Sequence, residues 1–540
     1  MAVTRTARFA CALLLLGSAT LAGAVRAQTA QDPLTPREAS RFLAQSTLGA
    51  SWEEIHRTAD LGLQVWLDEQ FQQPIGRHQP FLDERRNMGL EIDTQTRRWA
   101  WWQQVMESPD PLRQRVAMAL SELFVVSDDV EAIGGNPIGL ANYYDMLLEN
   151  SFGNYRDLLL DVSLHPMMGV YLSHLKNQKS DPSRGRFPDE NYAREVMQLF
   201  SIGLFELNLD GTLQLDGGGK PIPTYDNDDI TEFAKIFTGL SFASAAPDFF
   251  GGDPVWTRPM RMYETQHEPG PKILLRGRYV PPGQSGMKDI QDAIDNLFHH
   301  PNVGPFISRR LIQRMVTSNP SPEYIRRVAT AFQNNGHGVR GDMKAVVTAI
   351  LLDPEAREWP SSIDATGGRL RESFLRRVHL ARAFDATSLA RIYPIDDSAA
   401  PVNFGQRPLS SPSVFNFFLP DHQPTGPITD AGLFAPEFQI ITAVTAIASA
   451  DDLETQIVRA MNFDDNAFYE VRLDLTDEIV LAPNVPALID RLDLMLTYGN
   501  MSGQMRQILN QAVAQLGDPT DRAKLALYLI AISPEYAVVQ

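Results

Sequence analysis

Helix-start signals recur along nearly the whole chain, and they constrain the fold more than any other feature. Two are capping boxes, in which Ser or Thr precedes a helix and a Glu three residues later caps it in return. Others place Pro at the first helical position. Examples begin at Thr35, Ser51, Asp110 and Ser321, and apolar residues with helical spacing follow them. The sequence therefore predicts a mainly α fold, with a large multi-helix, bundle-like domain.

Two segments interrupt the helical pattern. Residues 206–225 alternate polar and apolar side chains around Asp-Gly turns, which predicts a short β-hairpin. Residues 242–287 are rich in Gly and Pro and predict a long irregular loop, a kind of segment that is usually functional or disordered. We expect an N-terminal helical region, residues 28–360, that contains both segments. A C-terminal helical region, residues 361–540, is expected to pack on it.

The first 27 residues resemble a secretory signal peptide. Arg5 and Arg8 precede a short apolar run, which ends in small residues and the sequence Val25-Arg26-Ala27. The run is too short to span a membrane, and no later stretch approaches the roughly 18 apolar residues that spanning requires. The sequence predicts a soluble protein that is periplasmic or secreted, with no membrane attachment after signal cleavage.

Cysteine content and charge exclude several classes of function. The single cysteine, Cys11, lies inside the signal segment, so the mature chain is expected to have no disulfide and no thiol chemistry. The formal net charge is −18 and no basic patch stands out, which argues against nucleic acid and against anionic membrane surfaces as partners. The acidic balance is compatible with cation binding but does not require it.

The segment from Pro188 to Phe200 places polar groups on a helix that is otherwise apolar. Four of them share one helical face, namely Asn191, Arg194, Glu195 and Gln198. Unpaired buried charge is costly, so this stripe needs partners. Two interpretations remain open. Arg194 holds helices in register within a structural network, or the stripe lines a binding or catalytic pocket.

Histidines provide further candidates for proton transfer. His267 lies in the 242–287 loop beside Glu268, where it is an acid, a base or a ligand, or else a solvated surface residue. His165 begins a helix, where capping or packing is the usual role. The candidate catalytic residues are Glu195, Arg194, His267 and Glu190. The candidate binding residues are Asn191, Gln198, His165 and Lys272.

A calcium site is a weaker possibility. Glu206, Asn208 and Asp210 loosely follow the first positions of a calcium-binding loop, but Gly217 stands where the loop needs a bidentate Glu. No other cofactor is predicted. The chain contains no Gly-x-Ser-x-Gly, no P-loop, no His-Glu-x-x-His and no Gly-x-Gly-x-x-Gly that opens a helix.

Several motifs, in order, resemble the bacterial domain-of-unknown-function 1800 (DUF1800) family, over about residues 35–540. They are His165-Pro166-Met167, Glu190-Asn191-Tyr192-Ala193-Arg194-Glu195, Phe237-Thr238-Gly239-Leu240, the His267, Gly270 and Lys272 element, Phe306-Ile307-Ser308-Arg309-Arg310-Leu311, Gly341-Asp342-Met343-Lys344-Ala345-Val346, Ser413-Val414-Phe415-Asn416-Phe417-Phe418 and Ala435-Pro436-Glu437-Phe438-Gln439. The resemblance implies an exported, mainly helical protein, and it transfers no catalytic residue. Members are often encoded beside an exported family of unknown function, DUF1501, which resembles sulfatase and phosphatase folds. The resemblance therefore implies a DUF1501-type partner.

The chain departs from the common family pattern at three positions. Gln198 and Phe200 stand where many members have Glu and His, and Leu240 stands where Trp is frequent. If that Glu/His pair serves a metal in other members, this chain lacks it.

These observations support two functions. The first is an accessory or binding protein for an extracellular polymer or a partner enzyme, with a polar pocket between the 190–203 helix and the 242–287 loop. The alternative is a hydrolase of extracellular polymer. In that case Glu195 or Glu190 acts as acid and base, Arg194 is the charge partner, and His267 is the second proton carrier.

Overall fold

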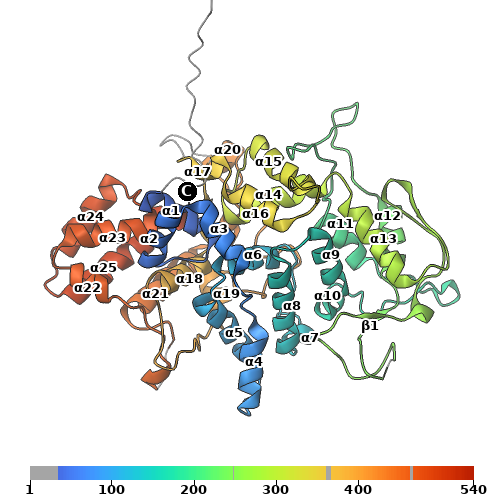
Figure 1. Ribbon diagram of the computed structural model, residues 1–540, viewed down its shortest axis with the longest axis horizontal. Coiled ribbons are helices and arrows are strands. Elements are labelled where there is room, and N and C mark those ends of the chain that lie inside the picture. The colour runs from blue at the N-terminus through green and yellow to red at the C-terminus, as the bar shows by residue number, and fades with distance from the viewer. Residues whose placement is uncertain (1–33, 247, 360–366, 463–465, 540) are drawn as a thin grey trace, which may run out of the picture.

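The computed structural model describes residues 34–246, 248–359, 367–462 and 466–539. It confirms the mainly α fold. The protein is 54% helical, with 26 α-helices and only short antiparallel strand pairs in its described part (Figure 1). The expected signal segment, residues 1–27, lies outside the described residues.

Ten helices build the chain as far as residue 171. They are α1 (Pro36–Ser46), α2 (Trp52–Leu61), α3 (Leu63–Gln72), α4 (His78–Asn87), α5 (Thr94–Glu107), α6 (Pro111–Ser121), α7 (Glu131–Gly134), α8 (Pro137–Asn150), α9 (Tyr155–Leu164) and α10 (Pro166–Tyr171). Both capping boxes are present. The Thr35 hydroxyl accepts from the Glu38 N–H, and the Ser51 hydroxyl accepts from the Glu54 N–H. In each box the Glu carboxylate accepts from the capping residue's own N–H in return.

The middle and the end of the chain add sixteen helices. The middle set is α11 (Asn191–Gln198), α12 (Asn227–Ile236), α13 (Gly286–Phe298), α14 (Val303–Met315), α15 (Pro322–Gln333), α16 (Met343–Leu351) and α17 (Pro354–Arg357). The last set is α18 (Ser373–Ala383), α19 (Ala400–Phe404), α20 (Pro427–Asp430), α21 (Ala443–Val458), α22 (Thr476–Leu481), α23 (Val485–Thr497), α24 (Gly503–Val513), α25 (Pro519–Ala531) and α26 (Pro534–Ala537).

Strands are short and pair only locally or at the chain end. They are β1 (Leu240–Ser241), β2 (Arg261–Met262), β3 (Lys272–Leu274), β4 (Arg278–Val280), β5 (Arg369–Leu370) and β6 (Val538–Val539), paired antiparallel as β1 with β2, β3 with β4, and β5 with β6. Five short 3-10 helices complete the description: η1 (Pro182–Arg184), η2 (Glu264–Gln266), η3 (Leu275–Gly277), η4 (Pro436–Ile440) and η5 (Ala467–Tyr469).

The two segments that interrupt the helical pattern are both more ordered than a loop. Three isolated antiparallel bridges, 205 with 223, 207 with 213 and 215 with 221, fold the first segment into the expected small hairpin. The 242–287 segment contains β2 and the β3–β4 hairpin, so it is not irregular throughout. Strands of two or three residues are too short to produce a visible alternation, which is why the sequence predicts only a loop there.

The first and last helices of the chain pack together. In Figure 1, α1 and α2 (blue) lie beside the red helices at one end of the molecule, and α11 to α13 (green) lie at the other end. The Ser40 hydroxyl on α1 donates to the Leu494 carbonyl on α23 at 2.6 Å. One cluster of buried apolar side chains runs from Ala39 to Tyr536. The division into two regions near residue 360 stays a prediction.

A buried charge network ties α6 to α14 and to the start of the C-terminal region. Glu122, at the end of α6, pairs with Arg314 of α14 at 3.2 Å and accepts a hydrogen bond from Gln406 at 2.7 Å. Arg369 of β5 pairs with Glu372 at 2.5 Å and with Glu437 at 3.2 Å. Burial raises the pKa of Glu122 to about 7, against the opposing charge of Arg314.

This network predicts a specific pH dependence of stability. A carboxyl whose pKa is higher in the folded than in the unfolded chain costs stability as pH rises between those two values. For Glu122 the window runs from 4.5 to about 7. We therefore expect a Glu122→Gln variant to gain melting temperature relative to the natural chain as pH is raised from 5 to 8. An exposed control, Glu323→Gln, is expected to show a constant difference. A Glu122→Gln difference that is also constant would mean that Arg314 keeps Glu122 ionised throughout.

No helix in the described ranges combines the length and the apolar character that crossing a membrane requires.

Candidate functional site

Helix α11 carries the polar stripe at the boundary between core and solvent. It begins where the Asp189 carboxylate accepts the Asn191 N–H at 2.9 Å. After the helix, Gly203 turns the chain with φ 71°, and a Cβ there would lie 2.8 Å from the Phe306 ring. Tyr192 and Val196 face the core. Within the stripe, Glu195 is 7% exposed, Arg194 and Gln198 are half-buried, and Asn191 is exposed.

The exposed members of the stripe make weak contacts. Arg194 pairs with Glu190 at 3.6 Å, and both side chains are more than 40% exposed. Gln198 accepts from the Tyr225 hydroxyl at 3.3 Å, and the Asn191 amide donates to the Ser173 hydroxyl at 3.3 Å. Exposed ion pairs of this kind contribute little to stability. Asn191, Arg194 and Gln198 therefore keep much of their hydrogen-bonding capacity on the solvent side of α11.

The carboxyl group of Glu195 is the unusual member. Burial raises its pKa, although the nearby Arg194 guanidinium acts in the opposite direction. Its Oε2 atom is buried and has no hydrogen-bond partner. A buried acceptor without a donor is costly, so its presence in a folded protein calls for an explanation.

The charges of Glu195 and Asp129 both influence the phenol of Tyr171, the last residue of α10. Burial raises the pKa of the Tyr171 phenol to about 12, the Ser411 side chain lowers it, and the charges of Asp129 and Glu195 raise it further. Asp129 is 55% exposed, and burial and the charge of Asp128 raise its pKa.

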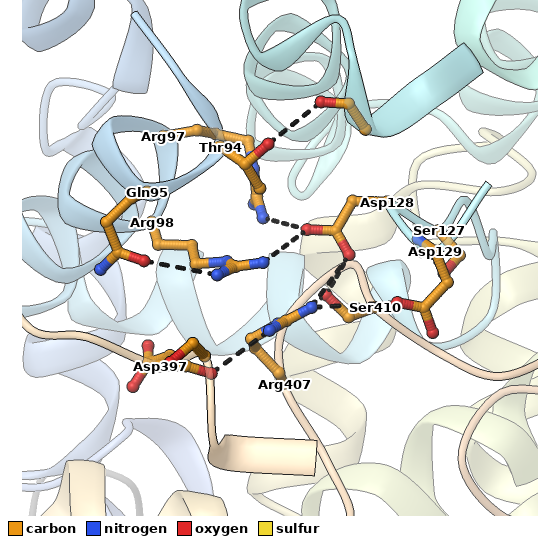
Figure 2. Close-up of polar contacts among 12 residues, drawn as sticks. Thr94, Gln95, Arg97, Arg98, Ser127, Asp128, Asp129, Asp397, Arg407 and Ser410 are labelled. Atoms are coloured by element: carbon orange, nitrogen blue, oxygen red, sulfur yellow. Dashed lines mark hydrogen bonds and ion pairs between the residues drawn. The ribbon is translucent and has the colours of Figure 1, made fainter. Parts of the chain in front are cut away.

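A buried carboxylate holds the loop that carries Asp129. Asp128 is 2% exposed and accepts from Arg97 at 2.9 Å, from Arg98 and Arg407 at 3.3 Å each, and from the Ser410 hydroxyl (Figure 2). Burial alone would raise the pKa of Asp128, but Arg97 and its other partners bring it below the usual value. The network joins α5, the loop after α6 and the loop after α19. No signal in the sequence indicates it.

His267 lies in a different environment. It is 2% exposed, its Nδ1 donates to the Thr238 carbonyl at 2.9 Å, and its Nε2 contacts the Asp289 carboxylate at 3.0 Å. Lys272, equally buried, donates to Asp289 and to the Glu268 carbonyl. Among the residues that the structure describes, no hydrogen bond or ion pair joins His267 to α11. The geometry favours a structural role for His267 and Lys272, and their catalytic and binding roles stay predictions.

His165 occupies the capping position that its sequence context suggested. Its Nδ1 accepts from the Met167 N–H at 3.2 Å at the start of α10, and its Nε2 faces the Asn142 side-chain oxygen at 3.2 Å. Burial lowers its pKa to about 3, so the ring is neutral and Nε2 donates. This arrangement agrees with capping rather than ligand binding.

The candidate calcium ligands are engaged in local contacts. Asp210 accepts from the Thr212 N–H at 3.0 Å, Asn208 donates to the Thr212 hydroxyl at 2.9 Å, and Glu206 accepts from Arg276 at 3.1 Å. Within the described part of the chain, no group of three or more His, Cys, Asp or Glu side chains is placed to hold a metal ion. Calcium binding stays a prediction.

Comparison with known proteins gives one match. A family model described as "Protein of unknown function (DUF1800)" matches residues 41–538, nearly the whole chain, which confirms the resemblance seen in the sequence motifs. No curated protein and no solved structure matches.

Proposed function

Because the chain belongs to the DUF1800 family, whose description assigns no activity, we propose a function from its own site. The protein is an exported binding or accessory protein for a hydroxyl-rich extracellular polymer. Its ligand face is the polar side of α11, formed by Asn191, Arg194, Glu195 and Gln198. Export to the periplasm or the medium rests on the signal-like segment, residues 1–27.

The unpaired Oε2 of Glu195 carries this proposal. A buried acceptor at the edge of an exposed polar face needs a donor, and a ligand hydroxyl supplies one. Arg194 adds guanidinium donors, and the amides of Asn191 and Gln198 both donate and accept. A polysaccharide chain offers donors and acceptors at short intervals, which suits such a face.

Substitution of Glu195 tests the proposal. Glu195→Met removes the acceptor and is expected to weaken polysaccharide binding about 10- to 100-fold, the cost of one hydrogen bond to a charged group. Glu195→Gln keeps an acceptor oxygen and is expected to retain most of the binding. Affinity electrophoresis against a panel of neutral and acidic polysaccharides measures both. Neither variant is expected to lower the melting temperature, because the lost group has no partner at Oε2.

The matched control is Glu323→Gln, an exposed acid at the start of α15. If no polysaccharide retards the natural protein, the binding proposal is wrong. If both Glu195 variants melt far below the natural protein, the stripe is a structural network instead.

A partner protein is the second expected occupant of the same face. The family resemblance points to an exported DUF1501-type protein. Co-purification of the two proteins, with the natural chain and with Glu195→Met, tests whether that partner uses α11.

A hydrolase remains the second candidate, because Glu195 is a buried carboxyl at the edge of an exposed polar face, with a raised pKa and an unpartnered Oε2. A buried protonated carboxyl donates a proton to a leaving group, while an exposed carboxylate accepts one from water. The same Glu195→Gln variant separates the two functions. It abolishes turnover if Glu195 is the acid, and it leaves binding largely intact in either case.

A further inference from the structure

A hollow lies between the β3–β4 hairpin and α13, and none of its lining residues belongs to α11. Its volume is about 500 Å³, and it is formed by η3 and β4 on one side and by the end of α13 on the other. The side chains that matter for its chemistry are Arg276, Arg278, Asn296 and His300.

His300 presents a buried donor without a partner. Its side chain is 1% exposed, and its Nδ1 accepts from the Asn302 N–H at 3.2 Å, so the neutral ring carries its proton on Nε2. Burial and the charges of Arg276 and Arg340 lower its pKa to about 4, so the ring is neutral at pH 7. The nearest carboxylate oxygen, on Glu206, is 3.7 Å away, too far for a hydrogen bond.

Asn296 has a buried acceptor without a donor. Its amide nitrogen donates to the Leu275 carbonyl at 3.1 Å, which fixes the orientation of the side chain. The other amide atom, Oδ1, is buried and has no donor. One hollow is therefore lined by an unsatisfied donor and an unsatisfied acceptor. A hydroxyl group, which donates once and accepts as well, can satisfy either atom.

The rim of the hollow is cationic. Arg278 is 61% exposed, and its nearest carboxylate contact, with Asp292, is 3.8 Å long. Arg276 is 54% exposed, contacts Glu206 at 3.1 Å, and sits in a left-handed backbone conformation with φ 59°. Such strain in a non-glycine residue is retained where surrounding structure requires it, often at ligand sites.

The acids near the hollow already hold cations. Asp292 binds Lys288 and accepts from the Gln284 amide, and Asp295 pairs with Arg156 at 2.5 Å. The guanidinium of Arg278 is the least engaged charge at the rim, and an arginine fork suits carboxylate and phosphate groups.

We propose that this hollow binds a hydroxylated organic anion, the chemistry shared by a uronate residue and a sugar phosphate. Arg278 and Arg276 hold the anionic group. Ligand hydroxyl groups accept from His300 Nε2–H and donate to Asn296 Oδ1. The site is separate from α11, so it does not depend on the function proposed above.

Titration calorimetry on the whole mature chain tests the site with four probes: galacturonate, glucose 6-phosphate, galactose and inorganic phosphate. Galacturonate, glucose 6-phosphate or both are expected to bind saturably. Binding of galacturonate alone indicates a carboxylate ligand, and binding of glucose 6-phosphate alone indicates a phosphate ligand. Galactose, which lacks the anion, and inorganic phosphate, which lacks the adjacent carbon-bound hydroxyl, are expected to bind much more weakly. Absence of heat from both hydroxylated anions overturns the proposal. Equal binding of inorganic phosphate overturns the hydroxyl part of it.

Two variants test whether the ligand binds in this hollow. Arg278→Gln is expected to weaken binding about 10-fold or more, the loss of a charge-assisted hydrogen bond, and its exposed position protects the fold. The matched control is Arg184→Gln, an exposed arginine on η1. His300→Leu removes the donor and is expected to weaken binding similarly. If Arg278→Gln binds as well as the control, the ligand lies elsewhere and the assignment is wrong, whatever the folding of His300→Leu.

Discussion

An Asp128→Asn variant is expected to lose about 3–5 kcal/mol of unfolding free energy, the usual cost of removing one partner from a buried ion network. Asp128 is 2% exposed, and the guanidinium groups of Arg97, Arg98 and Arg407 converge on it. Asparagine keeps the shape but removes the charge. The three cations then remain in a desolvated site, and an amide NH2 group, which cannot accept, replaces one of the two oxygens that accept from the arginines and from Ser410.

Chemical denaturation followed by tryptophan fluorescence measures this loss. Trp102 is a suitable probe, because its indole N–H donates to Asp397 at 2.6 Å, and Asp397 in turn accepts from Arg407 through its backbone carbonyl (Figure 2). The matched control is Asp129→Asn, on the neighbouring residue, which is 55% exposed. We expect the control to remain within about 0.5 kcal/mol of the natural protein, as surface substitutions usually do. A similarly small loss for Asp128→Asn would show that the three arginines find other partners.

The helical architecture could be predicted because its signals are local. The capping boxes at Thr35 and Ser51 connect groups only three residues apart, and the structure places both as the sequence suggests. The proline at the start of α15 works in the same way. Such patterns need no knowledge of the rest of the fold.

The candidate site could be predicted only in part. The stripe on α11 is visible in the sequence, but which member is buried depends on neighbouring segments, and only Glu195 is. Asp128 gives no signal, because its partners lie 30 to 282 residues away along the chain. From the sequence alone, Arg97 and Arg98 on α5 are expected to face solvent. In the structure they share Asp128 with Arg407 and Ser410 of the loop after α19.

The burial of His267 could not be predicted from the sequence either. A histidine before Glu268 and Pro269 in a Gly- and Pro-rich segment is typical of a solvated or reactive loop residue. In the structure it is buried, and Asp289, 22 residues later in the first turn of α13, contacts its Nε2. Long-range pairing of this kind decides whether a charged group serves chemistry or stability, and spacing along the chain does not encode it.

An Asp289→Asn variant tests the structural role of the His267, Lys272 and Asp289 cluster. It is expected to lose about 3–5 kcal/mol of unfolding free energy, because it leaves the buried Lys272 ammonium without a carboxylate. Both side chains are 1% exposed. Burial would raise the pKa of Asp289, but hydrogen bonds from His267 and Lys272 bring it below its usual value. A carboxyl with a lowered folded pKa stabilises the protein at neutral pH and loses that contribution as pH falls. The natural chain is therefore expected to lose more stability than Asp289→Asn between pH 5 and pH 3.

The double variant Lys272→Met/Asp289→Asn distinguishes a structural network from a catalytic one. Removing both charges leaves no ion unpaired, so the double variant is expected to be more stable than Asp289→Asn alone, a coupling that a double-mutant cycle measures directly. Hydrogen exchange in residues 264–286 is expected to rise in the single variant and to recover in the double one, because this network fixes that segment to α12 and α13. If Asp289→Asn keeps its stability and instead abolishes a hydrolytic activity, His267 belongs to a reactive centre and not to the scaffold.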